Sequence, residues 1–266
     1  MSFLGLSEKT FLIAGVANKK SVAYFSAKTL MDEGAKCIFS VQKEEQRAQI
    51  EKLFPGSPVV VCDVENSADL AQLPFEINKH ADHIDGLLHS LAFANFSEGL
   101  QPFHHTNRTD YLQAAQISAF SLVEMCHALN PLFTSAASVV TISISNTRAT
   151  SYGYLGPIKA MLDAIVPYLA KSLSADSHIR VNAVGAGPLK TSASAGIPDY
   201  IDNYLFAEAL TLRKEALQTQ EVANTVAFLL SHRSSGINAT TVLVDAGMSC
   251  NGFDQDVVKS FSKNQV

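Results

Sequence analysis

A strand, a loop and a helix are predicted around the segment Ser143-Ile-Ser-Asn-Thr-Arg-Ala-Thr-Ser-Tyr152-Gly-Tyr-Leu-Gly-Pro-Ile-Lys159. An apolar run typical of a buried strand precedes it, and apolar residues with helical spacing follow it. Pro157 suits the first turn of the helix, where no backbone donor is missed, and Lys159 is predicted in that turn. A phenol and an ammonium held together at the carboxyl end of a strand could donate a proton or a hydrogen bond to a reacting carbonyl oxygen. From this segment alone, a loop tyrosine and a lysine on a solvated helix face remain the alternative.

The composition excludes several classes of protein. Of 266 residues, 47% are hydrophobic and 17% charged, which is ample for a core and unlike a disordered chain. A net charge of -5 without any basic run argues against binding to nucleic acid or to an acidic membrane. The amino terminus lacks the order of a signal peptide, and no apolar stretch reaches the length of a membrane span. Four scattered cysteines show no metal-ligand spacing, so we expect a soluble cytoplasmic protein without a metal.

Short apolar runs alternate with longer amphipathic segments along the whole chain. Strands are predicted at residues 10–15, 36–41, 59–62, 84–90, 138–142, 180–184 and 241–245. Helices are predicted at residues 21–33, 44–53, 67–80, 108–129, after Lys159, and at 220–231. Strict alternation implies parallel strands with right-handed crossovers, hence an α/β fold: a Rossmann-type doubly wound sheet of about seven strands covered by helices on both faces. No linker divides the chain, so residues 1–266 are predicted to form a single domain. In such a sheet, ligands bind beyond the carboxyl ends of the strands.

The turn after the first strand is a candidate dinucleotide site. Gly15-Val-Ala-Asn-Lys-Lys-Ser21-Val-Ala23 opens the first helix, where a pyrophosphate would meet helix N-terminal amides. The usual Gly-x-Gly-x-x-Gly is absent, so an ordinary strand-to-helix turn is the alternative. Asp63-Val64 follows the third strand and could contact an adenine, although Asp63 also suits a cap or a turn.

The second strand does not end in the acidic residue that commonly binds the ribose 2′-hydroxyl. It continues instead into Gln42 and Lys43, with Arg47 nearby. These two cations could bind a 2′-phosphate, and a solvated helix start explains them equally well. The choice between NADH and NADPH therefore stays open on these residues.

Together these segments resemble an enoyl-acyl-carrier-protein reductase, a divergent branch of the short-chain dehydrogenase/reductase superfamily. The resemblance runs from about Phe3 to Gly247. Its specific marks are the Gly15–Ala23 turn, Cys62-Asp-Val64, His89-Ser-Leu-Ala-Phe-Ala94, Thr106-Asn-Arg108, Tyr152 with six residues before Lys159, Arg180-Val-Asn182, Ala186-Gly-Pro-Leu-Lys-Thr191 with Ser192-Ala193, and Ala195-Gly-Ile197. The usual superfamily spacing, Tyr-x-x-x-Lys, would require tyrosine at Leu155, so the longer spacing is the discriminating feature.

The resemblance implies a role for each matching residue. The implied cofactor-binding residues are Gly15, Ser21, Val22, Gln42, Asp63, Val64, Leu91, Lys159, Leu189, Thr191, Ser192 and Ala193. The implied substrate-binding residues are Ala94, Ile144 and Tyr154, and a mobile substrate-binding loop is expected at about residues 190–207. The implied cofactor is NADH, with NADPH as the alternative, and the implied partner is an acyl carrier protein carrying an enoyl thioester.

The implied reaction is hydride transfer to the β-carbon of a trans-2-enoyl thioester, with Tyr152 and Lys159 as catalytic residues. Tyr152 would stabilise the enolate oxygen, and donors of this kind commonly supply roughly 3–4 kcal/mol. Lys159 would bind the nicotinamide ribose and make the local potential positive, which is expected to lower the pKa of Tyr152.

Two positions depart from the family pattern. Ile144 replaces a second aromatic residue, usually tyrosine, so an apolar wall remains where a polar role is lost. The segment before Tyr152 is two residues shorter than usual, and Tyr154 is interpreted as a pocket wall. His89 is interpreted as structural, and His104-His105 has no partner in metal-ligand spacing.

Two alternatives to the leading hypothesis remain. A carbonyl or alcohol dehydrogenase of the same superfamily is disfavoured by Leu155, and a non-catalytic dinucleotide-binding paralogue is suggested by Ile144. The resemblance also implies a homotetramer, with residues 108–129 and the helix after Lys159 at its interfaces.

Overall fold

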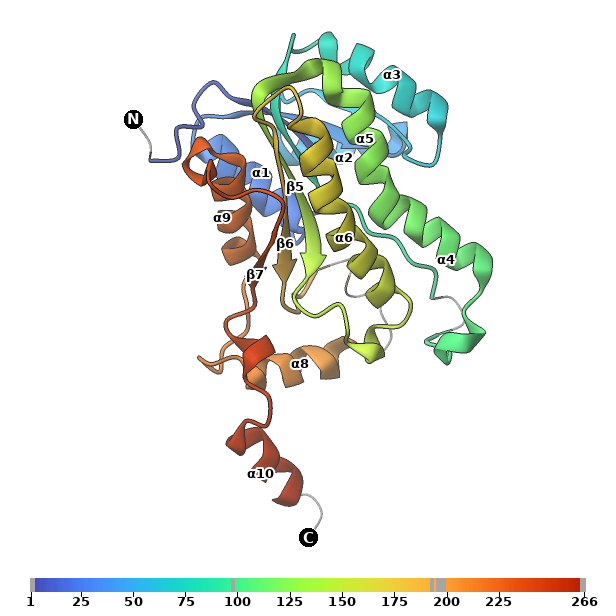
Figure 1. Ribbon diagram of the computed structural model, residues 1–266, viewed down its shortest axis with the longest axis vertical. Helices are drawn as coiled ribbons and strands as arrows, with labels where there is room; N and C mark the ends of the chain where they lie inside the picture. The colour runs from blue at the N-terminus through green and yellow to red at the C-terminus, as the bar shows by residue number, and fades with distance from the viewer. Residues whose placement is uncertain (1–2, 97–98, 192–193, 195–199, 264–266) are drawn as a thin grey trace.

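Seven parallel strands form one sheet in the order β3-β2-β1-β4-β5-β6-β7 (Figure 1). The computed structural model describes residues 3–96, 99–191, 194 and 200–263. The strands are β1 (Thr10–Ala14), β2 (Lys36–Val41), β3 (Val59–Val61), β4 (Ile84–His89), β5 (Phe133–Ile144), β6 (Arg180–Ala186) and β7 (Thr241–Val244). Their order reverses between β1 and β4, which is the arrangement of a doubly wound sheet. The predicted fold class is confirmed.

Helices cover both faces of the sheet, because each parallel connection must cross a face. The helices are α1 (Val22–Asp32), α2 (Arg47–Leu53), α3 (Ser67–Asn78), α4 (Arg108–Ala115), α5 (Ser121–Leu129), α6 (Leu155–Leu173), α8 (Tyr200–Leu210), α9 (Thr219–Leu230) and α10 (Gln255–Lys263). Buried side chains of α3, α5 and α6 form one apolar cluster, and those of α1, α2 and α9 form the other. The core therefore lies in two layers, one on each side of the sheet.

Strand β1 shows how the sequence produces these two layers. Side chains alternate between the two faces of a strand, and all of them must be apolar when both faces are covered. Leu12 and Ala14 belong to the cluster of α3, α5 and α6, whereas Phe11 and Ile13 belong to the opposite cluster. An unbroken apolar run is therefore the expected pattern for a central strand.

Strand β5 differs from the prediction in its extent, and the helix at residues 108–129 differs in its interior. Strand β5 begins at Phe133, five residues before the predicted start, in a Phe-Thr-Ser-Ala stretch that is too polar to reveal a strand. The predicted helix 108–129 is continuous but contains a π-helical turn, η3 (Gln116–Phe120), between α4 and α5. In that turn the Ser118 hydroxyl accepts from the amide of Phe93 (2.8 Å) and donates to its carbonyl (3.0 Å). This part of the helix is thus tied to the loop after β4.

Two α-helices in the described part of the chain were not predicted. Helix α8 begins within the segment expected to be a loop and ends beyond it, and its apolar residues do not gather into one stripe. Helix α10 begins close to the carboxyl terminus and extends away from the body of the molecule (Figure 1). No helix among the described residues is both long and apolar enough to cross a membrane.

Candidate active site

Lys159 lies beneath the carboxyl end of β5. Its side chain is only 5% exposed, and its Nζ donates to the carbonyl oxygen of Ile142 at 2.8 Å. Helix α6 begins at Leu155, so Lys159 occupies its second turn and not the predicted first turn. The helix can begin before Pro157 because the first amides of a helix have no intrahelical acceptor, so a proline there loses no bond.

The charge of Lys159 depends on its surroundings. Burial lowers the pKa of Lys159 from 10.5 to about 8, and the carboxylate of Asp163, one turn further along α6, works in the opposite direction. Asp163 is itself fixed, since the Thr241 hydroxyl donates to its Oδ1 at 3.1 Å. Lys159 is therefore mainly cationic at neutral pH, with its titration close to the physiological range.

His89 ends β4 and is fully buried beside this lysine. Its Nδ1 lies 2.9 Å from the Thr141 hydroxyl, and its Nε2 lies 2.9 Å from the Ser121 hydroxyl. Burial, and then the charge of Lys159, lower the pKa of His89 to about 3, so the ring is neutral. With both ring nitrogens bonded inside the protein, His89 links β4, β5 and α5 and has a structural role, as the sequence indicated.

Tyr152 ends a single 3₁₀ turn, η5 (Thr150–Tyr152), immediately before α6. Its ring is half-buried against the cluster of α3, α5 and α6. Burial raises the pKa of Tyr152 to about 12, and the neighbouring phenol of Tyr200 acts in the same direction. The expectation of a lowered pKa was wrong, because burial disfavours the charged phenolate. Tyr152 is therefore a neutral hydrogen-bond donor throughout the physiological range.

The turn after β1 has the features of a phosphate site. Ser21 caps α1: its Oγ accepts from the amide of Tyr24 at 3.3 Å and donates to the carbonyl of Asn18 at 2.8 Å. Val22 is the first residue of the helix, whose leading amides lack intrahelical acceptors. Gly15 has φ +102°, and a Cβ there would lie 2.1 Å from the backbone oxygen of Ser90. These residues fit the pyrophosphate of a dinucleotide.

The two candidate adenosine residues meet at the ends of β2 and β3. Gln42 Nε2 donates to Asp63 Oδ2 at 3.0 Å, and Val64 is buried next to them. Arg47 is directed to other partners, since its guanidinium pairs with the carboxylate of Glu44 and donates to the carbonyl of Val59. The structure therefore brings Gln42 and Asp63 together. Of the two cations considered for a 2′-phosphate, Arg47 is already paired with Glu44.

The segment after β6 carries the remaining cofactor candidates. Leu189 is buried, and Thr191 donates its amide to Ser194 Oγ at 2.9 Å. Ser192 and Ala193 lie outside the described residues. Leu91 is half-buried beside the core on the loop after β4.

Tyr200 is a site residue that the sequence did not single out. Its hydroxyl bonds both the amide (2.8 Å) and the carbonyl (2.9 Å) of Leu189. Its phenol also raises the pKa of the candidate catalytic Tyr152. The only signal in the sequence was its position inside the expected substrate loop.

The three candidate substrate residues come from three segments: the end of β5, the loop after β4 and the residue before α6. Ile144 ends β5 and pairs with Ala186, and Ala94 is half-buried on the loop after β4. Tyr154 is 8% exposed, and its hydroxyl donates to the carbonyl of Asn95 at 2.9 Å. It borders a cavity of about 50 Å³ together with Phe96, Leu100 and Asp110. Its geometry agrees with a pocket wall.

The comparisons with known proteins agree with this arrangement. The family model described as "Enoyl-(Acyl carrier protein) reductase" matches residues 15–249. The NADH-dependent enoyl-acyl-carrier-protein reductase FabI of Enterococcus faecalis is 38% identical over 247 residues, covering 91% of this chain and 98% of that protein. The NADPH-dependent FabI of Staphylococcus aureus is 35% identical over 251 residues, covering 92% and 98%. The Bacillus cereus enoyl-acyl carrier protein reductase, crystallised with NADP+ and indole naphthyridinone, superimposes with a TM-score of 0.88 at 32% identity, covering 93% of this chain and 99% of that one.

The fold and the site define a nicotinamide-dependent oxidoreductase of the short-chain dehydrogenase/reductase type. Within that class, the chain belongs to the enoyl-acyl-carrier-protein reductase family.

Proposed function

We propose that this chain reduces the trans-2 double bond of an enoyl thioester carried by acyl carrier protein, in fatty-acid biosynthesis, with NADH as the reductant. The observation that carries the proposal is the placement of a neutral, half-buried Tyr152 just before α6 and of a buried, cationic Lys159 in the second turn of that helix. The relatives that match more than 90% of this chain are enoyl-acyl-carrier-protein reductases, which supports the same reaction.

The residues divide the chemistry between them. When bound, the reduced nicotinamide would supply a hydride to the β-carbon, and a proton taken up at the α-carbon completes the reduction. Tyr152 donates a hydrogen bond to the thioester oxygen, on which negative charge develops as the enolate forms. Lys159 adds a positive potential in a site where low polarity strengthens it. Because the pKa of Tyr152 is about 12, its hydroxyl stabilises this charge while keeping its proton.

The surroundings of the adenosine site support NADH over NADPH. Arg47 is paired with Glu44, so its charge is largely compensated. The carboxylate of Asp63, bonded to Gln42, would repel a 2′-phosphate at that position. Ser21 and the amino end of α1 would hold the pyrophosphate, and Leu189 and Thr191 would contact the nicotinamide half.

The proposed activity is tested by mixing the protein with a short trans-2-enoyl thioester and either reduced cofactor. We expect absorbance of the reduced nicotinamide to fall only when the enoyl thioester is present, and faster with NADH than with NADPH. A β-ketoacyl thioester serves as the control for the carbonyl-reducing alternative. Measurable cofactor binding without turnover of a carrier-protein-linked enoyl substrate would contradict the proposal.

Activity should also fall as the pH rises through about 8, the pKa of Lys159. Below that pH the lysine is protonated and the potential at Tyr152 is positive; above it the lysine is neutral. Tyr152 does not titrate in this range because its pKa is about 12. The measurement is kcat/KM for the enoyl thioester from neutral to alkaline pH, which reports on the free enzyme.

The Asp163→Asn variant is the matched control for this pH profile. Its amide oxygen can still accept from Thr241, while the negative charge that raises the pKa of Lys159 is gone. The midpoint should move to lower pH. An unchanged midpoint in this variant would show that another group governs the profile.

The organisation of the protein is part of the proposal. Residues 1–266 would form one reductase domain with its substrate-binding loop at about 190–207. A homotetramer is supported by large apolar side chains that α4, η3 and α6 expose, among them Leu112 (61% exposed) and Tyr168 (79% exposed). A cytoplasmic location is part of the same proposal.

A further inference from the structure

Helix α8 is weakly packed on the body of the protein. All of its residues are described, and Tyr204 and Ala207 are its buried side chains, whereas α6 has eight buried residues. Ile201 and Leu205 are more than half exposed. Apolar burial therefore contributes little to holding α8, and its position depends on polar contacts at its two ends.

The amino-terminal end of α8 is attached to the active site. The Tyr200 hydroxyl bonds the backbone of Leu189, and the phenol of Tyr200 also helps to raise the pKa of Tyr152. Lys190 Nζ lies 4.4 Å from the centre of the Tyr204 ring. A shift of α8 would consequently displace groups on both the cofactor side and the substrate side of the site.

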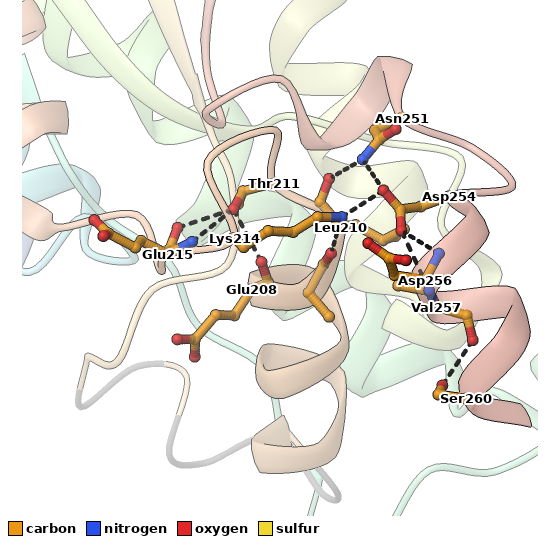
Figure 2. A network of polar contacts seen from close by, with 11 residues as sticks. Glu208, Leu210, Thr211, Lys214, Glu215, Asn251, Asp254, Asp256, Val257 and Ser260 are labelled. Atoms are coloured by element: carbon orange, nitrogen blue, oxygen red, sulfur yellow. Dashed lines mark hydrogen bonds and ion pairs between the residues drawn. The ribbon is translucent and has the colours of Figure 1, made fainter. Parts of the chain in front are cut away.

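The carboxyl-terminal end of α8 is held by side chains from outside the helix (Figure 2). Lys214 Nζ donates to the carbonyl of Ala209 at 2.9 Å, and Asn251 Nδ2 donates to the carbonyl of Leu210 at 2.8 Å. The last carbonyls of a helix have no intrahelical donor, so such bonds satisfy groups that otherwise need water. Both donors are positioned by a third residue, Asp254.

Asp254 joins α8 to α10. Its Oδ2 accepts from the ammonium of Lys214 and from Asn251 Nδ2, the latter at 2.9 Å. Its Oδ1 accepts from the amides of Asp256 (3.1 Å) and Val257 (3.2 Å) and so caps the first turn of α10. The hydrogen bonds of Lys214 and Asn251 hold the pKa of Asp254 well below its usual range, so the carboxylate is charged at neutral pH.

We propose that Asn251 and Asp254 are positioning residues for substrate binding: they fix the last turn of α8 and, through α8, the wall beside Tyr152. Both residues lie beyond residue 249, where the match to the family model ends. The contacts of Asn251 and Asp254 make the carboxyl-terminal segment a brace on an otherwise loosely held helix. The effect on KM rests on the proposed function, whereas the effect on hydrogen exchange in α8 does not.

The Asp254→Asn variant tests the brace. Asparagine keeps an oxygen that can cap α10, and it removes the ion pair with Lys214. We expect KM for the enoyl thioester to rise about fivefold, the upper range for an exposed ion pair. The value of kcat should stay within twofold of wild type, whereas the Kd for NADH should rise together with KM, because α8 also holds Leu189. Lys214→Met should reproduce the effect, and Asn251→Ala combined with Asp254→Asn should exceed it.

The Glu8→Gln variant is the matched control. It breaks an exposed ion pair with Lys36 (2.6 Å) at the opposite, amino edge of the sheet and changes the net charge equally. It should leave KM unchanged. Equal effects of Glu8→Gln and Asp254→Asn would overturn the inference, because the cause would then be net charge.

Hydrogen exchange gives a second readout that needs no turnover. Amides of residues 200–210 should exchange faster in Asp254→Asn than in wild type, while those of α6 should not change. Unchanged exchange in α8 together with unchanged KM would overturn the brace. If wild type does not reduce enoyl thioesters at all, the proposed function fails, and exchange in α8 still decides whether Asp254 holds the helix.

Discussion

Replacing Tyr152 with phenylalanine should lower kcat for enoyl reduction by about 10²–10³-fold, the loss typical for one preorganised donor to a developing oxyanion. The phenol sits in a half-buried position with a pKa of about 12, so it carries its proton whenever substrate is bound. Phenylalanine keeps the ring that packs against the core and removes only the hydroxyl. The Kd for NADH should therefore change little, because the lysine and the phosphate-binding turn remain.

Steady-state kinetics on the enoyl thioester, together with direct titration of NADH, separates these effects. Tyr154→Phe is the control, since it removes a nearby hydroxyl that donates to the Asn95 carbonyl. That loss of a hydrogen bond within the protein should reduce kcat by less than about tenfold. If Tyr152→Phe and Tyr154→Phe behave alike, Tyr152 is not the donor to the enolate.

Replacing Arg180 with methionine should lower the free energy of unfolding by about 3–5 kcal/mol, because buried carbonyls left unpaired cost about 1–3 kcal/mol each. Arg180 begins β6 and is 7% exposed. Its guanidinium donates to four carbonyl oxygens at 2.9–3.1 Å, which belong to Leu229, Ser231, Ser234 and Ile237. It thereby fastens the end of α9 and the following turn to the sheet.

Chemical denaturation monitored by circular dichroism measures this loss of unfolding free energy. Arg233→Met is the control: its exposed guanidinium donates to the carbonyl of Phe3 at 2.6 Å. That substitution should cost less than about 1 kcal/mol, as is usual for surface positions. If both variants lose the same unfolding free energy, the four buried hydrogen bonds of Arg180 contribute no more to stability than the exposed bond of Arg233.

The sheet could be predicted from the sequence because its strands are buried on both faces and read as short apolar runs. Gln42 and Asp63 were both named as adenosine-site residues by the family resemblance, and the structure brings them into contact where β2 and β3 end. Strand β5 was predicted too short because Thr134 and Ser135 hide its beginning. The local sequence pattern was sufficient to predict the position of the strands, whose hydrogen-bonding partners are neighbouring strands of the same sheet.

The remaining features depend on contacts between distant segments. The raised pKa of Tyr152 results from desolvation and from Tyr200, which comes 48 residues later. The role of Arg180 depends on carbonyls at the end of α9, about 50 residues away. Helix α8 lacks a one-sided apolar pattern because it is mostly exposed, so periodicity could not reveal it. In each case the deciding partner is set by the tertiary fold.

The contact between Gly15 and Ser90 has a consequence for how nucleotide sites are recognised in sequences. Gly15 is the one position of its turn where the backbone angle and the neighbouring strand both exclude a side chain. Further along, Ser21 caps α1 and Ala23, fully buried, permits close packing, so two positions commonly filled by glycine accept other small residues. A search for the Gly-x-Gly-x-x-Gly motif would miss the nucleotide site of this chain. The turn is identified by one residue that must lack a Cβ, Gly15, and by two others that need only be small, Ser21 and Ala23.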